Sequence, residues 1–126
     1  MIEFGPTYGV GVDKDGYVYE WGQLTKNLKK IPADMGKVVD IAVGQDHVLA
    51  INDKGNLYTW GFNRMGLNVI PPELKGKKIA DIEAGYQVSV VVTEDGKVVS
   101  WGNTSAVDIS TANVKDEKVK EVKANI

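Results

Sequence analysis

The chain has 126 residues, of which 43% are hydrophobic and 25% charged, and this balance predicts a single globular domain over residues 1–126. The formal charge of -2 gives no electrostatic reason to expect nucleic acid as a partner, and cysteine is absent, which excludes a disulfide framework. No apolar run approaches the roughly 20 residues of a membrane span, and the segment MIEFGPTYGV lacks the pattern of a signal peptide. We therefore expect neither a membrane partner nor a leader, and the compartment stays unknown.

One phrase recurs along the chain, as DGYVYEWG (15–22), KGNLYTWG (54–61) and DGKVVSWG (95–102). Each copy ends in a Trp-Gly pair, and a glycine precedes each pair at a constant distance. We call these three residues, Gly5, Gly44 and Gly85, the marker glycines. The period of about 40 residues divides the chain into three units, approximately 5–44, 44–85 and 85–125.

Each unit reads as β-structure in chain order. Ile2 opens a strand before the first marker glycine, and short apolar runs such as HVLAI (47–51) and VSVVV (88–92) predict strands after the later ones. Turn signals follow, because Gly supplies a positive φ in DKDG (13–16) and its counterparts, and the Trp-Gly segment returns as a strand. The charged tail KDEKVKEVK (115–123) resembles a helix, but its alignment with IADIEAG (79–85) predicts a strand.

A period of about 40 residues with several strands in each unit is typical of a β-propeller blade. We expect the tryptophans to fill the space between stacked blades and the following glycines to allow close backbone contact. The predicted structural core of the repeat is Trp21, Gly22, Trp60, Gly61, Trp101 and Gly102.

The second unit carries IAVGQDHVLAINDKGNLYTWGFNRMG (41–66), which resembles the repeat of the regulator of chromosome condensation propellers. The short period is similar to a bacterial branch of that family, exemplified by β-lactamase inhibitor protein II. The likeness covers nearly the whole chain, although the first unit lacks the Asn after Trp-Gly. It implies an all-β fold of propeller blades. Family propellers usually have seven blades, so three blades predict a ring closed by self-association or by further repeats.

The resemblance also implies a binding face, because loops after the marker glycine and after Trp-Gly carry aromatic residues that grip the target in the inhibitor. His47, the only histidine, is expected to orient a loop through hydrogen bonds, and DKDG (13–16) to be a hairpin turn rather than a calcium loop. No catalytic residue, cofactor or metal site is expected. The candidate protein-binding residues are Tyr8, His47, Phe62, Asn63, Arg64, Met65, Tyr86 and Gln87.

The leading functional prediction is a non-catalytic protein-binding scaffold with an unidentified protein partner. One alternative is a structural subunit of a larger particle, such as a viral or cell-surface assembly, and a weaker one is a small-GTPase exchange factor. Two chains of three blades would supply six, a number that a propeller can close. The sequence therefore also predicts a homodimer that forms a six-bladed ring, with a chain cut from a longer propeller as the alternative.

Overall fold

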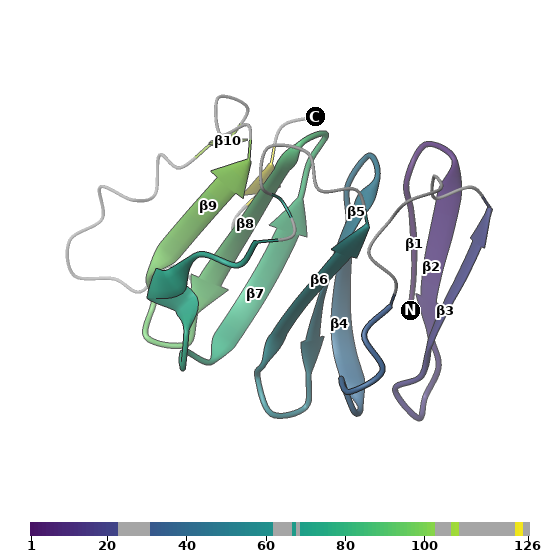
Figure 1. The fold of residues 1–126 in the computed structure, drawn as a ribbon, viewed down its shortest axis with the longest axis horizontal. Helices are drawn as coiled ribbons and strands as arrows, with labels where there is room; N and C mark the ends of the chain where they lie inside the picture. The colour runs from purple at the N-terminus through teal and green to yellow at the C-terminus, as the bar shows by residue number, and fades with distance from the viewer. Residues whose placement is uncertain (23–30, 62–66, 68, 103–106, 109–122, 125–126) are drawn as a thin grey trace.

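The structure is a computed structural model that describes residues 1–22, 31–61, 67, 69–102, 107–108 and 123–124. Three antiparallel sheets of three strands stand side by side in chain order (Figure 1). Their arrangement confirms the predicted all-β fold of stacked blades. In the part of the chain that the structure describes, no helix is long and apolar enough to cross a membrane.

Every sheet has the same order, in which consecutive strands pair. The first sheet contains β1 (Ile2–Phe4), β2 (Tyr8–Val12) and β3 (Val18–Gly22). The second contains β4 (Val38–Val43), β5 (His47–Asn52) and β6 (Leu57–Gly61), and the third contains β7 (Ile79–Ala84), β8 (Val88–Thr93) and β9 (Val98–Gly102). The marker glycines at which the units were divided lie between the first and second strands of each sheet. A short 3₁₀ turn, η2 (Pro72–Leu74), precedes the third sheet.

The Trp-Gly pair has a steric explanation. Gly61 has a φ of 107°, and a Cβ placed on it would lie 2.5 Å from the main-chain oxygen of Asp46. A Cβ on Gly22 would lie 2.6 Å from the carbonyl oxygen of Thr7, and one on Gly102 would lie 2.5 Å from that of Gln87. Each sheet therefore needs glycine where its third strand passes the turn between its first two strands.

Main-chain hydrogen bonds join consecutive sheets at their hairpin end. The amide of Val38 donates to the carbonyl of Gly16 at 3.1 Å, and one unit later the amide of Ile79 donates to that of Gly55 at 2.9 Å. Gly16 and Gly55 are the hairpin glycines, with φ values of 86° and 79°. DKDG (13–16) thus forms the predicted turn, and the turn also positions the next sheet.

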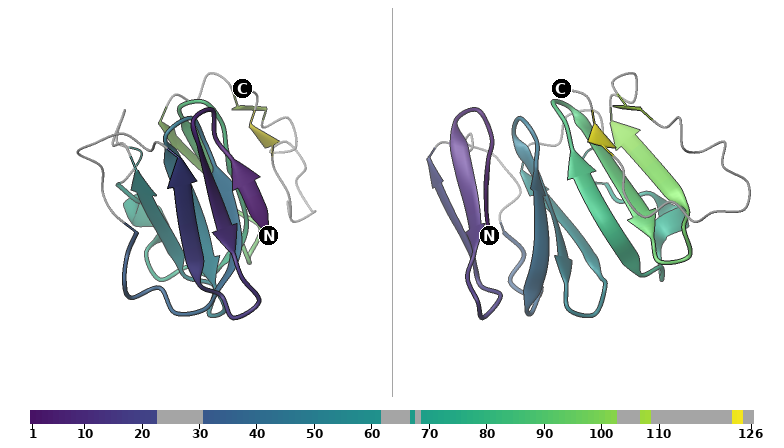
Figure 2. Two further views of the ribbon diagram at one scale, coloured as in Figure 1. Left: turned by 90° about the vertical axis from the view of Figure 1, so that its right-hand side faces the viewer. Right: turned by 180° about the vertical axis from the view of Figure 1, so that it is seen from behind.

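Two short strands follow the third sheet, β10 (Val107–Asp108) and β11 (Lys123–Ala124), and they pair with each other. Strand β11 contacts β7 and β8, as β7 contacts β4 and β5 (Figure 2). The tail therefore includes a strand, as the alignment predicted, and it lies where the first strand of a further blade would lie. The rest of the predicted strand, residues 119–122 and 125, lies outside the described residues.

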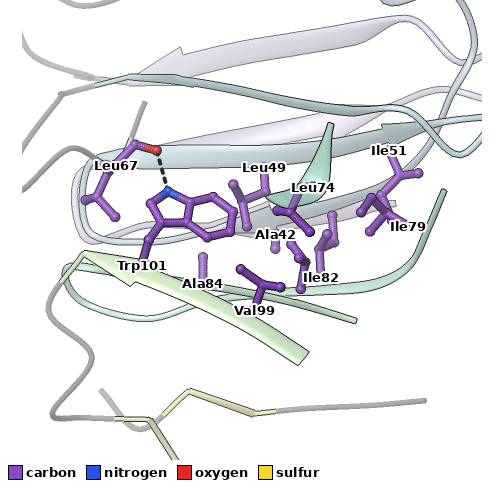
Figure 3. Packing of buried hydrophobic residues seen from close by; sticks show 11 residues of the cluster. Ala42, Leu49, Ile51, Leu67, Leu74, Ile79, Ile82, Ala84, Val99 and Trp101 are labelled. Atoms are coloured by element: carbon purple, nitrogen blue, oxygen red, sulfur yellow. Dashed lines mark hydrogen bonds between the residues drawn. The ribbon is translucent and has the colours of Figure 1, made fainter. Parts of the chain in front are cut away.

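The core lies between the sheets. One cluster joins the first and second sheets around Trp60, and another joins the second and third around Trp101, whose Nε1 donates to the carbonyl of Leu67 at 3.0 Å (Figure 3). Trp60 and Trp101 are 0% and 9% exposed, but Trp21 is 44% exposed, which corrects the expectation that all three tryptophans are core residues. Trp60 and Trp101 pack against the preceding sheet, and no described sheet precedes that of Trp21.

Candidate protein-binding end of the sheets

The segments that follow the marker glycines lie at one end of the stack. We call residues 5–7, 44–46 and 85–87 the marker loops. Each is closed by the same main-chain bond, in which the marker glycine amide donates to the carbonyl three residues later, at 2.9, 2.8 and 3.0 Å. Because the three sheets share one strand order, the three loops come together at the end opposite the hairpins (Figure 1).

Glycine allows neighbouring marker loops to touch. A Cβ on Gly5 would lie 2.9 Å from the carbonyl oxygen of Gly44, and a Cβ on Gly44 would lie 2.5 Å from that of Gly85. A side chain at either position would separate the loops. The recurrence of the marker glycine thus has a physical cause, since it places the loops of all three sheets in one continuous row.

A groove of about 200 Å³ runs across this row, and its lining comes from all three marker loops and the strand ends before them. Tyr86, which is 48% exposed, lies in the loop of the third sheet, and the exposed Phe4 belongs to the end of β1. The lining consists of Phe4, Gly5, Pro6, Val43, Gly44, Gln45, Gly85 and Tyr86. A groove with exposed aromatic rings suits contact with a protein surface, because aromatic residues dominate binding hot spots.

Tyr8 is not part of this groove, which corrects its prediction as a loop aromatic. It lies in β2 and is buried against the second sheet. Its hydroxyl oxygen lies 2.8 Å from the carbonyl of Gly44 and 3.0 Å from that of His47. Burial raises the pKa of Tyr8 well above its usual range, and the nearby Asp46 carboxylate adds to that shift. Tyr8 therefore joins two sheets and presents no surface to a partner.

His47 is also inaccessible, since it is fully buried in β5. Its Nε2 lies 3.1 Å from the carbonyl oxygen of Val88, which requires Nε2 to carry the proton and donate. Burial lowers the pKa of His47, so that the neutral imidazole is favoured. The expected hydrogen bond is present, and the buried side chain of His47 leaves no surface for contact with a partner.

The remaining candidates divide into two groups. Tyr86 is exposed in the groove and Gln87 follows it, half-buried. Phe62, Asn63, Arg64 and Met65 lie outside the described residues. Strand β6 ends at Gly61, which pairs with His47 at the start of β5, so the chain leaves the second sheet at the marker-loop end.

Three residues of the groove, Phe4, Pro6 and Gln45, were not predicted from the sequence. The alignment of Phe4 with Val43 before the marker glycines was a usable signal.

Carboxylates accompany the first strand of each sheet. Burial raises the pKa of Asp40 in β4, and the nearby carboxylates of Asp81 in β7 and Glu3 in β1 raise it further, against the opposing hydrogen bond from the amide of Ile41. The first strands therefore form an acidic edge that begins beside the groove at Phe4. Among the residues that the structure describes, no group of three acidic or histidine side chains could hold a metal ion.

Part of the chain matches a known family of repeats. The model of the regulator of chromosome condensation (RCC1) repeat matches residues 38–67 and 79–105. Protein pim1 of Schizosaccharomyces pombe is 24% identical over 155 residues, which cover 94% of this chain and 29% of pim1.

Two solved structures share the fold. Human WBSCR16 superposes with a TM-score of 0.68 at 22% identity, over 96% of this chain and 37% of that one. Prp20p of Saccharomyces cerevisiae gives a TM-score of 0.66 at 22% identity, over 92% and 34%. The chain thus spans roughly a third of the length of these relatives, and its place in a bacterial branch stays a prediction. The chain thus contains repeats of the regulator of chromosome condensation type at residues 38–67 and 79–105, within a fold that these solved structures share.

Proposed function

We propose that this chain is a non-catalytic protein-binding module whose partner docks at the marker-loop end. The observation that carries the proposal is the groove, because three units of the sequence contribute to one surface and the exposed Tyr86 lies on it. The relative Prp20p has been described with its binding to Gsp1p and histones, which supports a protein as the class of partner. We propose no particular partner on that ground.

The chemistry of the end suggests what the partner presents. The groove has room for about one large apolar side chain, and the acidic edge of Glu3, Asp40 and Asp81 lies along the first strands beside it. A partner with an apolar anchor flanked by Lys or Arg fits both features, since opposite charges guide the encounter and buried aromatic contacts supply most of the affinity.

Substitution of Tyr86 tests the binding site. We expect Tyr86→Ala to weaken binding of a partner captured from the native host by about tenfold or more, which is the loss of about 1.4 kcal/mol typical of an interface anchor. Val69→Ala is the control, because Val69 is an exposed apolar residue outside the groove lining. Calorimetric titration measures the affinity, and circular dichroism checks the fold. Equal affinity in Tyr86→Ala and the unsubstituted chain would move the site elsewhere.

Phe62→Ala extends the test to the Trp-Gly side of the same end. Phe62 follows the Trp-Gly pair of the second unit and Tyr86 follows the marker glycine of the third. We expect a double substitution to weaken binding more than either single one. The thermal midpoint should change little, since loop residues outside the core carry little folding energy.

We further propose that two copies close a six-bladed ring, which makes the chain a subunit of an assembly. The observation that favours this second role is the open face of the first sheet, where Trp21 is exposed although its counterparts are buried. Light scattering behind a sizing column at micromolar concentration should give twice the chain mass of 13.7 kDa. A mass of one chain would exclude the ring and leave the marker-loop proposal intact.

A further inference from the structure

The first sheet faces the viewer in the left panel of Figure 2. Its outer face carries exposed apolar side chains. The ring of Phe4 packs edge-on against Trp21, with ring centroids 6.0 Å apart. Trp21 lies against Gly9 and Gly11, where a Cβ would come within 2.5 and 3.3 Å of the indole. The exposed large apolar side chains in the strands of this sheet are Ile2, Phe4, Tyr19 and Trp21.

The repeats show what covers this kind of face. Ile2 is 61% exposed, whereas Ile41 and Ile82, which hold its position in the second and third sheets, are 3% and 5% exposed. The tryptophans differ in the same way, because Trp21 is exposed whereas Trp60 and Trp101 are buried. The Nε1 of Trp60 donates to Glu20 of the preceding sheet at 2.5 Å. In both later sheets the cover is the preceding sheet of the stack. The natural occupant of the open face is therefore another blade of this type.

The third sheet carries the matching surface. Val88, Val90 and Val92 hold the positions of Tyr8, Val10 and Val12, with which the first sheet contacts the second. The three valines are fully buried and form a cluster separate from the cores between the sheets. Strand β11 contacts this sheet through β7 and β8, in the place that β4 takes beside β1 and β2. This side of the third sheet thus accepts the first strand of a following blade.

We infer that the open face of the first sheet docks onto the third sheet of a second copy of this chain, with β1 of one copy taking the place that β11 holds on the other. The inference rests on the proposed ring and names the two faces that meet. Because β1 and β11 hold equivalent positions, only one of them can lie on the third sheet at a time. Two such head-to-tail contacts close the ring and leave neither face open.

Ile2→Glu tests the face without touching the groove, since Ile2 is absent from the groove lining. Its control is Val69→Glu, which places the same charge at an apolar site of equal exposure, 62% against 61%. Sedimentation equilibrium at micromolar concentration should show dimers for the unsubstituted chain and for Val69→Glu. For Ile2→Glu we expect the dimer dissociation constant to rise at least tenfold.

The outcomes separate the proposed assembly from the proposed binding site. Dimers that persist unchanged in Ile2→Glu would overturn the inference and the six-bladed ring with it, since the ring closes through this face, and would leave a dimer formed through another surface. An unsubstituted chain that stays monomeric would overturn both, while the binding of a partner at the marker loops is tested independently through Tyr86.

A variant that retains only Trp21, made by Trp60→Phe and Trp101→Phe, gives a second readout. Acrylamide quenching of Trp21 should fall as the concentration rises through the dimer range.

Lys123→Pro tests the exchange of strands. Proline in β11 removes a main-chain donor and disfavours the pairing of β11 with β10. The position of β11 beside the third sheet is then less stable. We expect the dimer dissociation constant of this variant to fall several-fold, because β1 of the second copy then meets less competition. A dissociation constant that rises instead would show that β11 belongs to the assembled blade, and this would overturn the inferred exchange.

Discussion

The hydroxyl of Tyr8 in the first sheet bridges to the main-chain carbonyl of His47 in the second, with an oxygen–oxygen distance of 3.0 Å. One unit later His47 itself reaches the carbonyl of Val88 in the third sheet at 3.1 Å. The same position of the repeat thus joins each sheet to the next. The third unit has Val88 there, which has no side-chain donor, so this series of bonds ends at the third sheet.

Tyr8→Phe should lower the free energy of unfolding by about 0.5–1.5 kcal/mol, the usual net contribution of a hydrogen bond. The ring remains and the packing with it, so the loss reports the bond to the second sheet. Tyr17→Phe is the control, because Tyr17 is exposed in the first sheet's hairpin. Urea unfolding followed by circular dichroism measures both variants. Equal midpoints for the two would contradict a stabilising bond at Tyr8.

The pKa of His47 predicts a loss of stability in mild acid. Burial lowers the folded-state pKa below the unfolded value near 6.5, so the unfolded chain binds the proton more readily. Stability is therefore complete above about pH 7.5 and falls as the pH drops below about 6.5, by at most about 1.4 kcal/mol per pH unit. Urea unfolding at pH 7.5 and 5.5 should show this fall in the native chain. In His47→Gln it should be reduced, and parallel pH dependences of the two chains would refute the assignment.

The two environments of tryptophan predict different costs of truncation. Trp60→Ala should cost about 3–5 kcal/mol, because it empties the core between the first and second sheets. Trp21→Ala in a monomeric preparation should cost less than about half as much, since Trp21 is partly exposed. Chemical unfolding of both variants gives the comparison. A loss below about 1 kcal/mol for Trp60→Ala would show that its indole contributes little to the core.

Asp40→Asn should stabilise the chain at neutral pH. Burial and the carboxylates of Asp81 and Glu3 raise the pKa of Asp40, so ionisation costs folding free energy above the unfolded pKa near 3.9. The amide keeps an oxygen that can accept the bond from Ile41. The gain should be present at pH 7 and disappear as the pH falls below about 4. Thermal midpoints at pH 7 and pH 3.5 would reveal whether the advantage depends on pH.

The sequence predicted the elements that local chemistry determines. Hairpin glycines such as Gly16, the strand HVLAI and the place of the Trp-Gly pair all depend on residues within one unit, and each was found where it was expected. Burial of Trp21 was predicted wrongly because it depends on whether a sheet stands before it. Tyr8 was misplaced because the glycines of GPTYGVGV concealed a strand. The groove could not be predicted, since Pro6, Gln45 and Tyr86 meet only after three sheets have stacked.

The stacking order has a consequence for how the molecule opens. The second sheet is packed on both sides, whereas the outer face of the first is bare, so cohesion within a single chain passes only between neighbours. Opening should then begin at the first sheet and proceed inward. Amide protons of β2 should exchange with solvent deuterium well before those of β5, although both strands are buried along their whole length. The first sheet, which carries Trp21, should therefore be the first part of the chain to unfold locally.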